Sequence, residues 1–355
     1  MEETEREPYL VPTPIPPPRA VDAEEEAHEH DHRLRWRTPL VLFLLTLAST
    51  FYIGAASQTD VAYPDGAIGA ALRSHAYAAA AGALLRWVAS GWSYAVPLLA
   101  ILLCHEFGHY LMARRHRVPA SLPMFIPVPM PPFGTLGAVI KMRDRIKTRD
   151  ALLDIGAAGP LAGILVALPI TYIGLRLSPV LPNPRTGEWM QEGTSVIYGL
   201  LKYIAKGSIH PDHDVLLHPM AKAGWVGMFV TMINLIPYGQ LDGGHVAYAL
   251  LHHVHDKFAR WVIAALLALG IGTGLYWGRA LSAQHHDPWV FGAGYTQGFN
   301  WFVFAFLVWT MHRGTRGLHP PTDDGVLSPK RRLVAAFTLA LFVLLFMPVP
   351  LRFNA

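Results

Sequence analysis

The sequence predicts an all-α, polytopic membrane protein with about six or seven transmembrane helices and a small membrane-associated β-hairpin or re-entrant segment. Of the 355 residues, 52% are hydrophobic and only 15% are charged, whereas roughly a quarter of the residues of an average soluble protein are charged. Long apolar segments recur along the chain, and short clusters of Lys and Arg separate them. This pattern disfavours a soluble globule, and it indicates membrane topology in preference to nucleic-acid binding.

The first 37 residues differ from the rest of the chain and predict a disordered tail. Prolines recur between Pro12 and Pro18 and favour an extended chain, while Glu24, Glu25 and Glu26 repel one another. We therefore expect a disordered cytoplasmic tail over residues 1–37 and a transmembrane domain over residues 38–355.

Seven apolar segments are predicted to span the membrane, because most of them approach the roughly 20 residues that a helix needs to cross a bilayer. They cover residues 39–57, 92–113, 151–175, 221–237, 259–278, 299–312 and 332–350. Basic clusters such as Arg114 and Arg115, after the second span, fall on one side of the membrane if the seven spans alternate. The positive-inside rule then predicts a cytoplasmic N-terminus and an external C-terminus.

Two further apolar stretches do not fit a spanning helix. Residues 194–205 are short and amphipathic, which is typical of a helix that lies in the membrane interface. Within residues 119–142, the prolines at 123, 127, 129, 131 and 132 rule out a helix. We predict an extended chain, a turn near Gly134 and a strand through Val139 and Ile140. A re-entrant or membrane-edge hairpin is the favoured interpretation, and a cytoplasmic loop is the alternative.

The second span ends in an H-E-x-x-H motif formed by His105, Glu106 and His109. Residues i and i+4 share one face of a helix, so both imidazoles can reach one metal ion, and Glu106 can accept a proton from a metal-bound water. Composition alone predicts roughly 0.03 chance matches. Ionisable groups are costly in an apolar span and are usually functional there. The alternative is a set of interfacial residues that bind lipid headgroups.

A catalytic zinc site normally needs a third protein ligand, and Asp242 is the acidic candidate. The fourth span ends with residues 234–245, and the charge pattern directs this end and the H-E-x-x-H motif to the same side of the membrane. Pro237 and the following glycines interrupt the helix and let the chain turn towards the metal. An ordinary turn at Asp242-Gly243 is the alternative.

Together these motifs resemble the site-2 proteases, a family of intramembrane zinc metalloproteases. That family combines H-E-x-x-H on one transmembrane helix with an Asn…Leu-Asp-Gly motif on another, here Asn234 and 241–243. The resemblance implies that His105, His109 and Asp242 bind zinc and that Glu106 is the general base. The Gly-Pro-Leu-Ala-Gly stretch at 159–163 and the FGTLGAVI stretch at 133–140 also look like family features. The resemblance covers about residues 92–250, which it identifies as the catalytic core of a transmembrane protease domain.

The resemblance implies a zinc-dependent endopeptidase that cleaves transmembrane segments of membrane proteins in regulated intramembrane proteolysis. Its expected partners are a transmembrane protein substrate, the lipid bilayer and an upstream site-1-type protease. Its expected location is a bacterial inner membrane, with the active site near the cytoplasmic side. Many relatives insert a PDZ domain between catalytic helices, but the roughly 45 residues available here predict a compact form without one. The alternative function is a zinc-binding transporter or sensor that does not cleave, for which Glu106 would have no purpose.

The sequence assigns less specific roles to the remaining polar and small residues. Asn234 is a candidate oxyanion donor, with an equal alternative of capping or orienting the interrupted helix. His245 is a candidate substrate-site or supporting residue. Gly156, Gly159 and Gly163 are interpreted as residues that let helices approach closely, in preference to a direct chemical role.

Overall fold

Long helices form most of the computed structural model, which describes residues 36–58, 63–183, 189–285, 288–313, 322–323 and 325–354. The compact unit that carries them extends over Trp36–Ala355. The predicted disordered tail, residues 1–37, lies outside the described residues except for its last two positions.

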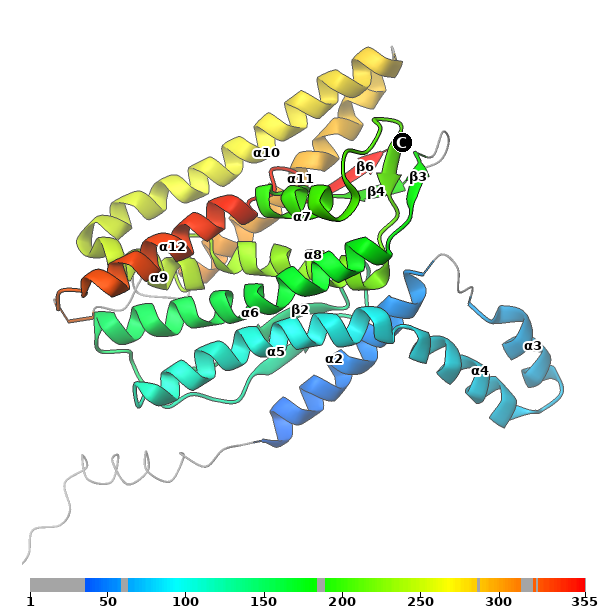
Figure 1. Cartoon of the computed structure of the whole chain (residues 1–355), viewed down its shortest axis with the longest axis horizontal. Helices are drawn as coiled ribbons and strands as arrows, with labels where there is room; N and C mark the ends of the chain where they lie inside the picture. The colour runs from blue at the N-terminus through cyan, green and yellow to red at the C-terminus, as the bar shows by residue number, and fades with distance from the viewer. Residues whose placement is uncertain are drawn as a thin grey trace, which may run out of the picture. The chain divides into compact units, whose positions relative to one another are not determined.

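Every predicted span corresponds to a helix (Figure 1). These helices are α2 (Arg37–Ala56), α5 (Trp92–Arg115), α6 (Arg149–Leu177), α8 (Pro219–Asn234), α10 (His255–His285), α11 (Pro288–Arg313) and α12 (Pro329–Leu345). Among the described residues, α2, α5, α6 and the Trp261–Ala283 part of α10 are long and apolar enough to cross a membrane. The prediction of a helical membrane protein is confirmed. The count of six or seven spans is not, since α8 and α12 have only 16 and 17 residues.

Local sequence signals explain where several helices begin. The hydroxyl of Thr148 accepts a hydrogen bond from the backbone N–H of Ala151 at the start of α6. Ser328 caps α12 in the same way, and Pro219 occupies the first turn of α8. Such residues suit the first turn because its N–H groups have no partner within the helix.

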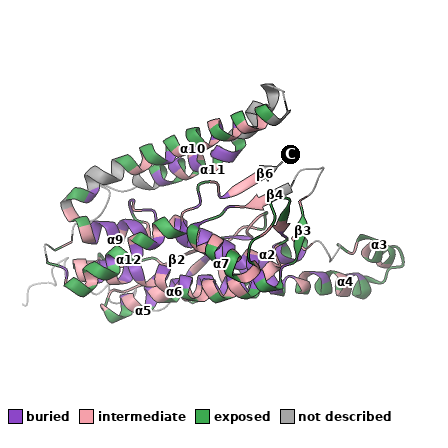
Figure 2. Ribbon diagram, turned by 45° about the horizontal axis from the view of Figure 1, so that its top comes forward, coloured by how far each residue is buried: buried purple, intermediate pink, exposed green. Residues whose placement is uncertain are grey.

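Helices α5, α6 and α8 carry most of the buried core. Figure 2 shows buried residues recurring along α5 and α6. Glycines let their backbones approach, because a β-carbon on Gly108 of α5 would lie 2.5 Å from the carbonyl oxygen of Ala158 on α6. A β-carbon on Gly224 of α8 would lie 2.2 Å from the hydroxyl of Thr171 on α6. We call the end of α5 with Arg115 the basic end and its opposite end the Trp92 end.

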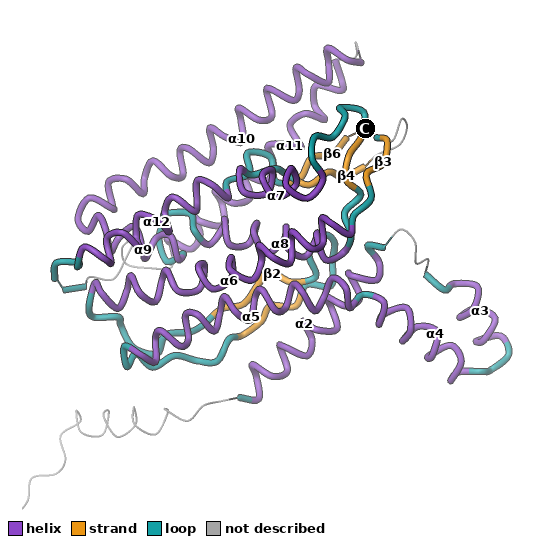
Figure 3. The backbone as a smooth tube through the Cα atoms, in the orientation of Figure 1, coloured by secondary structure: helices purple, strands orange, loops and turns teal. Residues whose placement is uncertain are grey.

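The proline-rich segment forms a hairpin that runs alongside the helices (Figure 3). Strands β1 (Met124–Pro127) and β2 (Thr135–Val139) pair antiparallel, and Gly134 takes a positive φ of 81° before β2. The hydroxyl of Tyr94 donates to the carbonyl of Phe133 over 2.8 Å. Tyr94 belongs to the Trp92 end, so the hairpin reaches along α5 and is not a loop beyond the basic end. The prediction of a hairpin is confirmed, with the second strand ending one residue earlier than expected.

Short elements at the Trp92 end form a region that we call the cap, defined as residues 178–183 and 189–218 together with β6 (Leu351–Asn354). Strand β3 (Val180–Pro182) pairs with β5 (His213–Val215), β4 (Trp189–Glu192) pairs with β6, and α7 (Val196–Lys206) is the predicted amphipathic helix. These strands were not predicted from the sequence, because three or four residues are too few to show a side-chain alternation.

Three helices were also not predicted. They are α3 (Asp65–Arg73), α4 (Tyr77–Ser90) and α9 (Asp242–Leu251), and the 3-10 turn η1 (His252–Val254) follows the last of them. With 9, 14 and 10 residues, these helices are shorter than the roughly 20 residues that a helix needs to cross a bilayer. Helix α9 matters most here, because it begins at Asp242.

Candidate metal site

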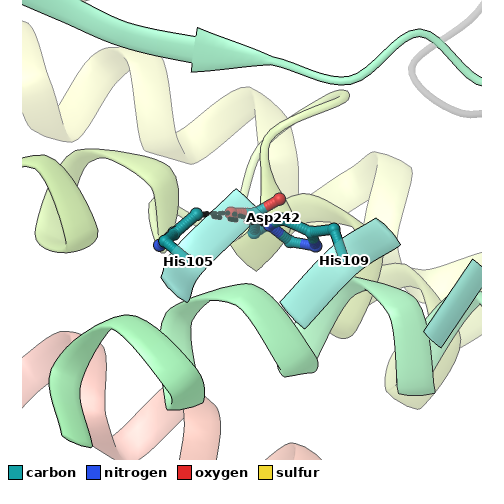
Figure 4. A group of neighbouring side chains, drawn as sticks. All are labelled: His105, His109 and Asp242. Carbon is teal, nitrogen blue, oxygen red and sulfur yellow. Dashed lines mark hydrogen bonds and ion pairs between the residues drawn. The ribbon is translucent and has the colours of Figure 1, made fainter. Parts of the chain in front are cut away.

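Two helices bring three metal-binding side chains together in the core (Figure 4). His105 and His109 lie one turn apart on α5 and are buried, and Asp242 comes from the first turn of α9. The Nε2 atoms of the two imidazoles are 3.2 Å apart, and each is 3.2 Å from Oδ2 of Asp242. Ligand atoms bound tetrahedrally to one zinc ion at 2.0–2.1 Å are about 3.3–3.4 Å apart. The donor set and its spacing therefore fit a zinc ion.

The interruption between α8 and α9 places Asp242. Helix α8 ends at Asn234, the chain turns at Gly239 with a φ of +57°, and α9 then begins with Asp242. A β-carbon on Gly243 would lie 2.0 Å from the carbonyl oxygen of Leu235. Only glycine allows the first turn of α9 to fold back this closely against the preceding loop. The structure thus joins the Leu-Asp-Gly motif to H-E-x-x-H, as the sequence predicted.

A backbone carbonyl orients one of the imidazoles. Nδ1 of His109 donates a hydrogen bond of 2.7 Å to the carbonyl oxygen of Ile155 on α6. This bond fixes the proton on Nδ1 and leaves the Nε2 lone pair facing His105 and Asp242. Ile155 was not predicted from the sequence, because a contact through the main chain leaves no signature in residue type.

Glycines on α6 make room for both imidazoles. A β-carbon on Gly159 would lie only 2.0 Å from Nε2 of His109, and one on Gly163 would lie 3.1 Å from Nδ1 of His105. The sequence interpretation of these glycines as close-packing residues is thereby sharpened. What packs against them is the pair of histidine rings, not only a helix backbone.

Glu106 lies between the two histidines in sequence and is 5% exposed. Its charge interacts with those of His109 and Asp242. Within the described part of the chain its carboxylate makes no hydrogen bond. A buried carboxylate beside a metal site, with no protein hydrogen bond to occupy it, is free to accept a proton from a water molecule.

Asn234 and His245, the two candidates with less specific roles, lie close to the three converging side chains. Nδ2 of Asn234 is 3.3 Å from Nε2 of His105, so Asn234 borders the candidate ligands. His245 lies one turn after Asp242 on α9, and its Cβ would be 2.9 Å from a β-carbon on Gly156 of α6. Both positions are next to the site, and neither provides one of the three converging atoms.

An ionic cluster near the basic end supports α6 beside the site. Asp154, the neighbour of Ile155, lies 2.9 Å from Nε2 of His116 and 2.7 Å from Nη2 of Arg331 on α12. Arg331 also reaches Asp150 over 2.7 Å. This cluster was not predicted from the sequence, because His116 and Arg331 are 38 and 177 residues away from Asp154. It fixes the helix that supplies the Ile155 carbonyl.

These features define a helical membrane protein with a buried site of metallopeptidase type. Comparison with known proteins agrees, since residues 93–273 match Peptidase family M50. The match covers half of the chain, and the chain belongs to this family. The resemblance to the site-2 proteases is thereby confirmed.

Curated plant proteins are similar to much of this chain. Probable zinc metalloprotease EGY1, chloroplastic, of Arabidopsis thaliana is 32% identical over 67% of this chain and 44% of its own length. Its counterpart of the same name in Oryza sativa subsp. japonica is 34% identical over 58% and 36%. Probable zinc metalloprotease EGY2, chloroplastic, of Arabidopsis thaliana is 27% identical over 76% and 43%.

The chain therefore spans less than half the length of these relatives. No solved structure matches it. The relatives are named as chloroplastic proteins, so the prediction of a bacterial inner membrane gains no support from them, whereas that of a membrane protein stands.

Proposed function

We propose that the chain is an intramembrane zinc metalloendopeptidase that cleaves transmembrane segments of membrane proteins. The observation that carries this proposal is the convergence of His105, His109 and Asp242 beside Glu106 in the buried core. Membership of Peptidase family M50 and the names of the plant relatives support it.

The side chains divide the chemistry among them. A zinc ion held by His105, His109 and Asp242 would supply a Lewis acid that activates water and polarises a scissile carbonyl. Glu106 accepts the proton of the attacking water and passes it to the leaving amine. The amide of Asn234 donates a hydrogen bond to the oxygen that gains negative charge. His245 of α9 packs against Gly156 of α6 and helps to position the first turn of α9.

The substrate is a transmembrane helix that unwinds locally, because the hydrogen bonds of an intact helix shield its peptide bonds. Strand β2 offers a place for the unwound segment, since Leu136 is 66% and Val139 is 51% exposed. An added strand would gain main-chain hydrogen bonds in an apolar setting. We further propose that this cleavage belongs to regulated intramembrane proteolysis, in which a site-1-type protease acts upstream.

For the membrane arrangement we propose six or seven spans, with the N-terminus and the basic end of α5 in the cytoplasm. The proposed domains are a tail over residues 1–37 and a protease domain over 38–355, with a catalytic core at about 92–250. His105 precedes Arg115 by ten residues, or about 15 Å of helix. Water would accordingly enter from the cytoplasmic side.

The decisive experiment compares the wild type with Glu106→Gln in vesicles that contain a transmembrane reporter. We expect cleavage to fall by about 10²–10⁴-fold, because the general base is lost, while bound zinc measured by mass spectrometry stays unchanged. Asp65→Asn, on the exposed helix α3, is the matched control and should cleave normally. Unchanged cleavage by Glu106→Gln would overturn the role of Glu106 as general base. A wild type that binds zinc but does not cleave the reporter would leave zinc binding without proteolysis as the function.

The ligand set has its own test. Asp242→Ala should lower the zinc content of the purified protein, because one of three converging donor atoms is removed. Full retention of zinc by this variant would remove Asp242 from the set of ligands.

A further inference from the structure

A second buried polar cluster lies at the Trp92 end, within a cavity of about 330 Å³. The end of α2, the tip of the hairpin, the start of α8 and strands of the cap enclose it. Its walls are largely apolar, with Pro132, Trp225 and Leu351 among them, and its polar groups include Ser57, Asn183 and Lys222. A mostly apolar cavity with a few placed polar groups is the usual form of a binding site. We call this cavity the cap pocket.

Lys222 gives the cap pocket a positive charge without a local counter-charge. Its Nζ donates a hydrogen bond of 2.9 Å to the hydroxyl of Ser57 and lies 5.9 Å from the ring centre of Tyr94. No carboxylate of the described residues lies within 4.0 Å of it. An ammonium group is costly to bury without an anion, so this arrangement favours an anionic ligand.

The two acidic residues of the pocket wall, Glu192 and Asp214, are both paired with another lysine, Lys202. Nζ of Lys202 is 3.1 Å from Oε1 of Glu192 and 2.7 Å from Oδ1 of Asp214. Burial alone would raise the pKa of Asp214, but the hydrogen bond and charge of Lys202 hold that pKa below its usual range. The hydroxyl of Tyr198 also donates to Glu192 over 2.8 Å. These two carboxylates therefore do not depend on Lys222 for a partner.

Asn183 adds an acceptor that lacks a donor. Its Nδ2 donates to the carbonyl of Pro211 over 3.2 Å, which fixes the orientation of the amide. Its Oδ1 is buried and has no hydrogen-bond partner in the described structure. A peptide that carries a carboxylate would satisfy both groups, since its N–H can donate to Asn183 and its carboxylate can accept from Lys222. A phosphodiester would satisfy Lys222 alone.

The distance to the metal site suits one unwound substrate segment. Tyr94, which contacts Lys222, and His105 are eleven residues apart on α5, or about 16 Å. An extended peptide covers this distance in about five residues. The hairpin lies between the two sites, with its tip residue Pro132 in the wall of the cap pocket.

We propose that the cap pocket binds a carboxylate of the substrate, with Lys222 donating to it and Asn183 accepting a peptide N–H. The carboxylate is an acidic side chain or a free C-terminus, and it lies about five residues from the scissile bond towards the Trp92 end. This inference rests on the proposed function and deepens it, because it names a feature by which the protease selects its substrates.

The test uses the zinc-loaded full chain in vesicles with a reporter that carries Glu or Gln at this position, and a second reporter that ends there as a free acid or an amide. The wild type should show a KM lower by about ten- to hundredfold for the acidic forms, with little change in kcat. Lys222→Met should abolish this preference, whereas Lys222→Arg should retain most of it. Lys206→Met is the matched control, because that ammonium donates to the carbonyl of Arg176 outside the pocket.

A binding measurement separates recognition from turnover. Fluorescent reporters of the same four forms are titrated against Glu106→Gln, and acidic forms should again bind about ten- to hundredfold more tightly. Equal affinity for all four forms would overturn the inference, and it would do so even where Lys222→Met fails to fold, because only the reporter is changed.

Two further outcomes have distinct meanings. Loss of bound anionic phospholipid from Lys222→Met, with the peptide preference unchanged, would assign the pocket to a lipid headgroup and overturn the inference. Failure of the wild type to cleave any reporter would overturn the proposed function, while the titration would still show whether the pocket prefers a carboxylate.

Discussion

Two buried polar clusters about 16 Å apart along α5 carry opposite kinds of polar group. The candidate metal site gathers three electron-pair donors within 4.8 Å, whereas the cap pocket holds an ammonium group that has no adjacent carboxylate among the described residues. Their construction also differs. Helices packed through glycines form the metal site, and short strands, a helix end and the hairpin tip form the cap pocket. The metal site, held by packed helices, suits catalysis, which requires fixed distances. The cap pocket suits the recognition of substrates that differ in sequence.

The largest effect is expected at the point where α6 touches the metal site. Gly159→Ala places a methyl group 2.0 Å from the present position of Nε2 of His109, so the imidazole must move. We expect zinc affinity to fall by about a hundredfold or more, measured by competition with a chelator. Gly272→Ala is the control, since its β-carbon would meet nothing within 4 Å. Normal zinc affinity of Gly159→Ala would show that this cluster is less rigid than we infer.

A smaller effect on the metal site is expected from a substitution in α12. Arg331→Gln removes the ion pairs with Asp150 and Asp154 and loosens α6 next to Ile155, whose carbonyl orients His109. Zinc affinity or kcat should decrease by roughly tenfold, because supporting residues of metal ligands typically contribute tenfold or more.

The neighbouring variant Arg332→Gln, at an exposed position, is the matched control for Arg331→Gln. The preference for acidic substrates should be the same in both variants, because the cap pocket lies at the other end of α5. Equal zinc affinity in the two variants would show that the ionic cluster does not act on the metal site.

The smallest effect concerns the pH dependence of the cap. Burial alone would lower the pKa of Lys202, but the charge of Glu192 and the contact with Asp214 raise it. Burial alone would raise the pKa of Asp214, but the hydrogen bond and charge of Lys202 lower it. The contribution of Asp214 to the stability of the cap is therefore present above its unfolded pKa of about 3.9 and is lost as the pH falls below that value. That of Lys202 is present below about pH 10.4 and is lost as the pH rises further.

Lys202→Met should accordingly destabilise the cap by about 1–3 kcal/mol near pH 7. Hydrogen exchange at the amide of Val215, which donates to Asp214 over 2.8 Å, should become faster, while exchange in α5 stays the same. Lys206→Met serves again as the control. Unchanged exchange at Val215 would show that the ion pair is not what holds the cap together.

Local patterns in the sequence determined the class of protein and the centre of the site. Apolar length located the long helices, prolines and Gly134 identified the hairpin, and helical spacing joined His105 to His109. Asp242 could be found as well, because Pro237 and the adjacent glycines mark the interruption of a helix. These features depend on residues that are close in sequence, where periodicity and turn chemistry act directly.

Only the tertiary structure decided which groups meet across the chain. The Ile155 carbonyl that orients His109, the contact of Gly159 with that ring and the pairing of β4 with β6 have no local signature. The isolation of Lys222 is likewise invisible in a sequence, where it is one lysine among several. The physical reason is that burial and hydrogen-bond satisfaction depend on partners brought together by packing, and spacing along the chain does not specify these partners.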